Sequence, residues 1–138
     1  MGGAACARRG GEPAGREESE ERVSSNGRSA ERGHHIELRG ARGRLQGKRF
    51  VELFTHGSLC VELFAPGGVD TQQPHTRDEV YVIIHGRGDF VFGDRRVTFG
   101  AGDVLFVPAG IAHRFEQFSD DLMTWVLFYG PAGGEDPQ

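Results

Sequence analysis

The residues with the clearest capacity for chemistry in this sequence are two histidines and one glutamate that together can bind a metal ion. His75 and Glu79 stand four residues apart in a stretch that is expected to be extended, and His113 follows later in the chain. Side chains alternate between the two faces of an extended strand, so Gln73, His75 and Glu79 are expected to point the same way. Imidazole and carboxylate groups bind divalent ions of intermediate hardness, and this set leaves coordination positions open for water, dioxygen or a substrate oxygen.

Short strands separated by turn residues must hold these side chains in place. From about Arg49 onward, apolar and β-branched runs alternate with glycine, proline and aspartate turns, and no helical period is visible there. This pattern predicts an all-β barrel or sandwich. The expected strands are residues 50–54, 59–64, 79–85, 89–92, 96–99, 104–107, 113–118 and 122–129.

Alternation within one of these strands places His113 inside the fold. Arg114 and Glu116 mark the face of strand 113–118 that is expected to be in water. The opposite face carries His113, Phe115 and Gln117 and is expected to be buried. A buried histidine needs a hydrogen-bond partner or a metal ion, which agrees with a ligand role for His113.

The same reasoning assigns the faces of strand 59–64 from its one charged residue. Glu62 is expected to face solvent, which would turn Leu59, Val61 and Leu63 inward.

The first 44 residues differ in composition from the rest of the chain. They are rich in Gly, Ala, Ser, Arg and Glu and almost free of β-branched and aromatic side chains, so they bury too little apolar surface to offset the entropy of ordering. We expect residues 1–44 to form a disordered tail and residues 45–138 to form one β-barrel domain. The nine arginines of the tail are interleaved with seven glutamates and the whole chain has a formal net charge of −4, which argues against a nucleic-acid partner.

The sequence also bears on location. No apolar run approaches the length needed to span a bilayer, and residues 1–11 lack the apolar core of a signal peptide. We therefore expect a cytoplasmic protein with no membrane partner.

The last expected strand predicts self-association. Strand 122–129 is apolar on both faces, with only Thr124 breaking the run. A strand that is buried on both sides needs a second covering layer, so an outer sheet face is expected to pack against a second copy of the chain in a homodimer.

The metal-binding stretch resembles the first motif of the cupins, which are small double-stranded β-helices of the jelly-roll type. That motif has a glycine, a His-x-His pair, a glutamate four residues after the second histidine, and a later glycine. Gly68, His75, Glu79 and Gly86 match it, and Gln73 stands where the first histidine is usual.

A second stretch resembles the second cupin motif. Gly102, Pro108, Gly110 and His113 match its spacing, and Gln117 stands where an asparagine is usual. The resemblance covers about residues 46–131 and implies a single-domain cupin in which the strand of Glu79 lies beside the strand of His113 inside the barrel. It is poor evidence for the reaction, because one scaffold hosts many chemistries.

The resemblance implies a site for one divalent ion, which could be Fe(II), Mn(II), Ni(II) or Zn(II). The ligand set would be Gln73, His75, Glu79 and His113. Two roles for Gln73 remain open: its amide oxygen binds the metal directly, or it forms a hydrogen bond to a water molecule on the metal. A cupin without a metal, in which these polar residues bind one another, is the alternative.

Two functions are compatible with such a site. The first is a metalloenzyme that acts on a small organic substrate; a dioxygenase, and so an oxidoreductase, is preferred over an isomerase or lyase because no convincing separate general base is visible. The second is a non-catalytic module that binds or senses a small molecule. The candidate catalytic residues are Tyr81 and Gln117. The residues expected to line the pocket, or else to form barrel core, are Tyr81, Ile83, Phe115 and Gln117.

Overall fold

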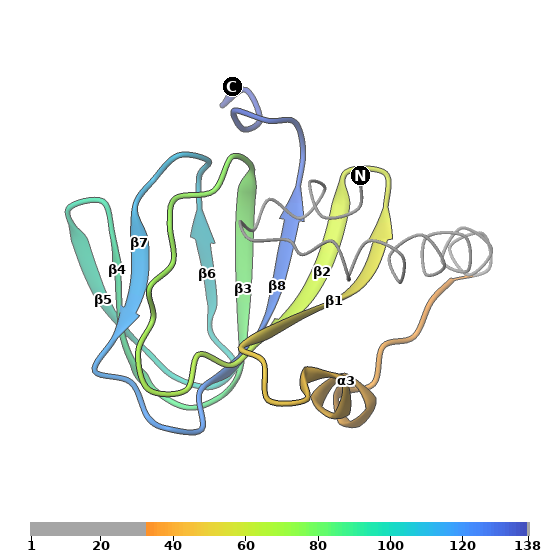
Figure 1. Cartoon of the computed structure of the whole chain (residues 1–138). Coiled ribbons are helices and arrows are strands. Elements are labelled where there is room, and N and C mark those ends of the chain that lie inside the picture. Colours follow the sequence, from red (N-terminus) through yellow and green to blue (C-terminus); the bar gives the residue numbers. More distant parts are fainter. Residues whose placement is uncertain (1–32, 138) are drawn as a thin grey trace.

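Two antiparallel sheets face each other in the computed structural model, which describes residues 33–137 (Figure 1). The larger sheet has the strand order β1-β2-β8-β3-β6, and the smaller one has the order β5-β4-β7. Neighbouring strands in each sheet are often distant in sequence, as in a double-stranded β-helix, so the expected all-β jelly-roll fold is confirmed. The strands are β1 Phe50–His56, β2 Leu59–Phe64, β3 Asp78–His85, β4 Gly88–Phe92, β5 Arg95–Phe99, β6 Val104–Val107, β7 His113–Glu116 and β8 Met123–Tyr129.

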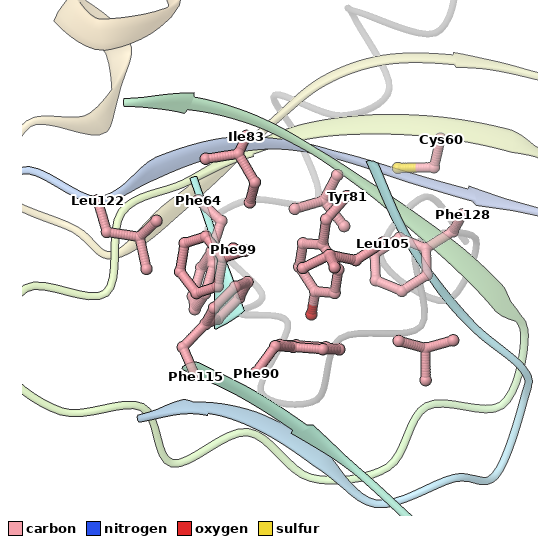
Figure 2. Close-up of a cluster of buried hydrophobic side chains, with 12 residues drawn as sticks. Cys60, Phe64, Tyr81, Ile83, Phe90, Phe99, Leu105, Phe115, Leu122 and Phe128 are labelled. Carbon is pink, nitrogen blue, oxygen red and sulfur yellow. The ribbon is translucent and has the colours of Figure 1, made fainter. Parts of the chain in front are cut away.

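The main core lies between the two sheets and is rich in aromatic rings (Figure 2). Tyr81 of β3 packs edge-on against Phe90 of β4 and Phe115 of β7, with ring centroids 5.5 and 5.1 Å apart, and Phe90 and Phe115 are 4.7 Å apart. Rings at these separations contribute stability beyond the area they bury. Because Tyr81 comes from the larger sheet and both phenylalanines from the smaller one, these contacts hold the two sheets together.

A helix, α3 (Leu38–Leu45), covers part of the outer face of the larger sheet. Ala41 and Leu45 are buried against Leu53 of β1 and Leu63 of β2 in a second apolar cluster. The prediction of a disordered tail is therefore wrong for residues 38–44. For residues 1–32, the prediction lies outside the part of the chain that the structure describes. Leu38, Ala41 and Leu45 have the spacing of one helical face, and this short period was masked by the polar composition around it.

The face assignment of β2 also needs correction. Glu62, expected in solvent, is only 1% exposed. Cys60 and Phe64, two residues to either side, belong to the core between the sheets, whereas Leu63 belongs to the cluster under α3. Glu62 shares the face of Cys60 and Phe64, which lies between the sheets, and α3 covers the opposite face, so both faces of this strand are buried.

A close backbone approach fixes the loop between β7 and β8 against the start of β4. A Cβ atom on Gly88 would lie 2.6 Å from the Cα of Phe118, which is closer than real Cβ contacts come. One residue earlier, the carbonyl of Arg87 accepts a 2.9 Å hydrogen bond from the backbone N–H of Ser119. Only glycine fits at position 88 without moving this loop.

Among the described residues, no helix has the length and apolar character required to cross a membrane.

Candidate metal centre

The three predicted ligands come from three different places in the fold. His75 lies in the loop before β3, Glu79 is the second residue of β3, and His113 is the first residue of β7. Since β3 and β7 belong to different sheets, the two sheets meet at this point of the interior.

Hydrogen bonds fix the loop and the start of β3. The carbonyl of His75 accepts a 2.8 Å hydrogen bond from the N–H of Gly110. The two carboxylate oxygens of Asp78 accept hydrogen bonds from the N–H groups of Ala109 and Glu135, both at 2.9 Å. The C-terminal segment adds a 2.7 Å bond from the N–H of Gly133 to the carbonyl of Thr76. The segment that carries His75 and Glu79 is thus held from two sides.

The ligand atoms of His75, Glu79 and His113 all lie within 4.8 Å of one another, and all three residues are buried. Glu79 Oε1 is 3.1 Å from Nε2 of His113 and 3.7 Å from Nε2 of His75. The two imidazole rings are 4.9 Å apart between centroids. The structure therefore brings together the three residues that the sequence proposed.

The tautomer of His113 can be assigned from its neighbours. Its Nδ1 is 2.8 Å from the carbonyl oxygen of Ile111, which can only accept, so Nδ1 carries a proton. In a neutral imidazole Nε2 would then point a lone pair at the Glu79 carboxylate. That arrangement is favourable only if Nε2 is protonated or if a cation lies between the two groups.

The electrostatics of His113 reflect this arrangement. Burial alone lowers the pKa of His113, but the adjacent Glu79 carboxylate and the Ile111 carbonyl outweigh it, so the pKa lies above its ordinary value. Two imidazoles and one carboxylate, buried with their ligand atoms converging, are a donor set that suits a divalent transition metal. The residues present therefore fit the ion that the sequence suggested.

The glutamine that reaches this cluster is Gln72, and Gln73 is exposed. Gln72 Oε1 lies 3.3 Å from Nε2 of His75 and accepts a 3.0 Å hydrogen bond from the hydroxyl of Tyr81. The expected position of Gln73 assumed strand alternation, but residues 65–77 pair with no strand, so alternation does not apply there. No feature of the sequence distinguishes the two adjacent glutamines.

The four expected pocket residues occupy different environments. Tyr81 is fully buried and its ring centroid is 6.2 Å from that of His113. Ile83 and Phe115 belong to the core between the sheets, which agrees with the alternative reading of them as barrel core. Gln117 is exposed, contrary to expectation: β7 ends at Glu116 and Gln117 has a φ of 50°, so the chain has already left the strand.

Sequence reasoning also missed Asp70. This residue is buried in the loop before His75, and its carboxylate accepts hydrogen bonds from Gln72 and from the backbone of β7. An acidic residue in a glycine-containing loop is typical of an exposed turn, so no signal in the sequence marked it as part of the site.

Comparison with known proteins places the fold in a family. The family model of the cupin domain matches residues 60–129 of the 138. The uncharacterized protein SCO3923 of Streptomyces coelicolor is 36% identical over 84 residues, which are 59% of this chain and 80% of that protein.

Two further similarities cover smaller parts of the other proteins. A crystal structure of DMSP lyases RdDddP and RnDddQII matches with a TM-score of 0.52 and 27% identity, over 64% of this chain and 50% of that chain. The HTH-type transcriptional activator RhaS of Shigella sonnei is 30% identical over 83 residues, which are 59% of this chain and only 30% of the activator. The matched domain, the two-sheet fold and the His-Glu-His cluster agree, and the chain belongs to the cupin family.

Proposed function

We propose that this chain is a metal-dependent enzyme that transfers a proton on a small organic substrate, in a reaction of the lyase or isomerase type. The observation that carries the proposal is the position of Tyr81: its hydroxyl group is buried and is hydrogen-bonded to Gln72, whose amide oxygen also approaches His75. A titratable hydroxyl group beside a metal-ligand cluster is the arrangement that acid–base catalysis needs.

His75, Glu79 and His113 would hold one divalent ion, either Fe(II), Mn(II), Ni(II) or Zn(II). When bound, such an ion supplies a Lewis acid that polarises a carbonyl or carboxylate oxygen of the substrate. The ring of His113 is oriented for this role by its Nδ1–H bond to Ile111, because that bond leaves Nε2 for the ion.

The chain itself supplies the proton-transfer group and a site with little water. Tyr81 would exchange a proton with a carbon or oxygen atom of a substrate held at the cluster. The ring centroid of Phe90 lies 6.1 Å from that of His113, and the ring centroid of Phe128 lies 5.2 Å from that of His75. These two rings form an apolar wall on two sides of the ligands. Excluding water in this way strengthens the electrostatic interactions within the site.

This proposal reverses the preference for oxygenation that the sequence suggested. That preference rested on the lack of a visible general base, and the buried hydroxyl group of Tyr81 supplies a candidate. The similarity to the DMSP lyase structure, at 27% identity, supports the lyase type. A binding or sensing module stays the second candidate, because the chain also resembles part of the transcriptional activator RhaS.

The experiment compares the wild-type chain with Tyr81→Phe, using Tyr129→Phe as the control since the chain has only these two tyrosines. Metal content is measured first. Each protein is then incubated in D₂O with compounds that carry an acidic C–H next to a carboxyl or carbonyl group, DMSP among them, and deuterium incorporation and product formation are followed by NMR. In parallel, an electrode records oxygen consumption.

We expect turnover or deuterium exchange in the wild type and in Tyr129→Phe. Tyr81→Phe should retain its metal and lose about 100-fold or more of the rate, the usual contribution of an acid–base group. Oxygen consumption without exchange would contradict the proposal in favour of a dioxygenase. Saturable binding with neither reaction would favour the binding module.

We also propose that the chain forms a homodimer through the outer face of β6. Val104 and Phe106 are 64% and 46% exposed, although the alternating residues Leu105 and Val107 are buried. β6 ends the strand order of the larger sheet, so these apolar side chains lie at a sheet edge. The same edge of a second copy would cover these side chains with an equally apolar surface.

A further inference from the structure

We infer that Asp70 is a positioning residue of this site: it fixes the amide group of Gln72 so that the amide oxygen faces the hydroxyl group of Tyr81 and the imidazole of His75. For its effect on catalysis the inference rests on the proposed function. The geometric part stands on hydrogen bonds alone.

The carboxylate of Asp70 is the fixed end of the arrangement. Asp70 is 5% exposed, and its Oδ2 accepts a 2.8 Å hydrogen bond from the backbone N–H of Phe115, two residues after His113 on β7. Its Oδ1 accepts a 3.2 Å bond from the backbone N–H of Gln72. The loop that carries Gln72 is thus tied to the same strand that carries one of the metal ligands.

This carboxylate also determines which way the Gln72 amide points. Nε2 of Gln72 donates a 2.9 Å hydrogen bond to Oδ2 of Asp70. An ionised carboxylate accepts and cannot donate, so the NH₂ end of the amide must face Asp70 and the oxygen must face the other way. Three N–H donors converge on this carboxylate, so it accepts in every one of these hydrogen bonds.

The oxygen end then sets the hydrogen bonding inside the site. Oε1 of Gln72 can only accept, so the hydroxyl group of Tyr81 donates to it at 3.0 Å. The same oxygen lies 3.3 Å from Nε2 of His75. If the amide turned over, an NH₂ group would face the Tyr81 hydroxyl and the imidazole, and the orientation of the hydroxyl group would be lost. Asp70 reaches both groups through one intervening side chain.

The variant that tests the inference is Asp70→Asn. One oxygen of Asp70, Oδ2, accepts both from Phe115 and from the Gln72 side chain, while Oδ1 accepts from the Gln72 backbone. Asparagine keeps only one oxygen for these three N–H donors, so its NH₂ group must face at least one of them and the hold on Gln72 is weakened. Gln72→Leu removes the amide altogether, and the double variant Asp70→Asn/Gln72→Leu completes a mutant cycle. Gln73→Leu, at the exposed neighbouring glutamine, is the matched control.

The first readout needs neither metal nor substrate. The side-chain NH₂ signals of Gln72 are assigned in ¹H–¹⁵N spectra by their absence in Gln72→Leu, and their exchange with solvent is measured. We expect slow exchange and a wide separation of the two protons in the wild type and in Gln73→Leu, and loss of both properties in Asp70→Asn. Unchanged Gln72 signals in Asp70→Asn would overturn the inference.

The second readout compares the four proteins of the mutant cycle. For each of them, the affinity for Co(II) is measured from its absorption spectrum, and the turnover rate is measured separately. Partners that orient a ligand or catalytic group typically contribute about 10- to 100-fold, so we expect a decrease of this size in Asp70→Asn. In the Gln72→Leu background the same substitution should change little. Equal effects in both backgrounds would mean that Asp70 only supports the fold. If the NMR result holds and no substrate turns over, the proposed function fails and the role of Asp70 stands.

Discussion

Nε2 of His113 lies 3.1 Å from Oε1 of Glu79, at the point where the two sheets meet. Without a cation, a proton on His113 is what makes this contact favourable, since the other ring nitrogen already donates to Ile111. The pair therefore links the charge state of the site to the stability of the fold.

The metal-free protein should become less stable as the pH rises above the ordinary histidine range. The pKa of His113 in the folded chain lies above its ordinary value of 6.5, so the folded state binds this proton more tightly than the unfolded state. The stabilisation is complete below about pH 6.5 and is lost as the pH rises through the folded pKa. Urea unfolding in the presence of a chelator, at a series of pH values, measures the free energy of unfolding and so this stabilisation. The variant His113→Gln should lose this part of the decrease in the free energy of unfolding with rising pH. If the same decrease persists in the variant, the assignment to His113 is contradicted.

Metal binding should show the opposite dependence on pH. A divalent ion needs the unprotonated Nε2 of His113, so the ion and the proton compete and binding releases the proton. We expect Zn(II) to raise the melting temperature more at about pH 8 than at about pH 6, because tighter binding gives greater stabilisation. Scanning fluorimetry measures the shift. Substitution of the exposed His85 by Gln serves as the control and should leave it unchanged.

The helix α3 should contribute measurably to stability. Leu45 is buried against Leu53 and Leu63, so Leu45→Ala should lower the free energy of unfolding by about 2 kcal/mol, the lower end for a buried leucine at the edge of a cluster. The exposed Arg42, on the same helix, provides the control Arg42→Ala. Urea unfolding measures both. Equal stability of the two variants would mean that the helix does not pack as described.

Position 88 should accept only glycine. The Cβ atom of Gly88→Ala would collide with the backbone of Phe118, so we expect destabilisation of about 1 to 3 kcal/mol. Gly100 has nothing within 4 Å of its Cβ position and its φ is not positive, so Gly100→Ala should be neutral or stabilising by up to about 1 kcal/mol. Thermal unfolding distinguishes the pair. A stable Gly88→Ala variant would show that the loop between β7 and β8 can move.

The proposed dimer should depend on Phe106. Phe106→Ser removes the larger exposed side chain of β6 and should shift the mass in solution from that of two chains to one chain, 15.1 kDa. Val69 is 55% exposed outside the strands, so Val69→Ser is the matched apolar-to-polar control. Light scattering coupled to size-exclusion chromatography measures the mass. A monomeric wild-type chain, or a Phe106→Ser variant that is still dimeric, would refute this interface.

Strand alternation and motif spacing carried the sequence interpretation where the chain is regular. They placed His113 on a buried face of β7 and Glu79 inside the barrel, because both residues lie in strands with continuous pairing. The same rule failed for Gln73, which lies in the long loop between β2 and β3, and for Gln117, which directly follows β7. Side-chain direction in a loop depends on contacts distant in sequence, such as the bond from Phe115 to Asp70, and no local pattern encodes these.

The two errors about the outer surface have one cause. Composition averaged over the first 44 residues concealed the apolar face of α3. Without α3, the charge of Glu62 was the only available guide to the faces of β2, and it indicated a solvent face on a strand that is buried on both sides. A single charged residue therefore does not mark a solvent face on a strand that other elements cover on both sides.

The hydrogen bonds from Gly133 to Thr76 and from Glu135 to Asp78 have a practical consequence. They make the last few residues part of the support for His75 and Glu79, although these residues lie beyond the final strand. A purification tag, a fusion partner or a protease acting there can disturb the metal ligands without unfolding any sheet.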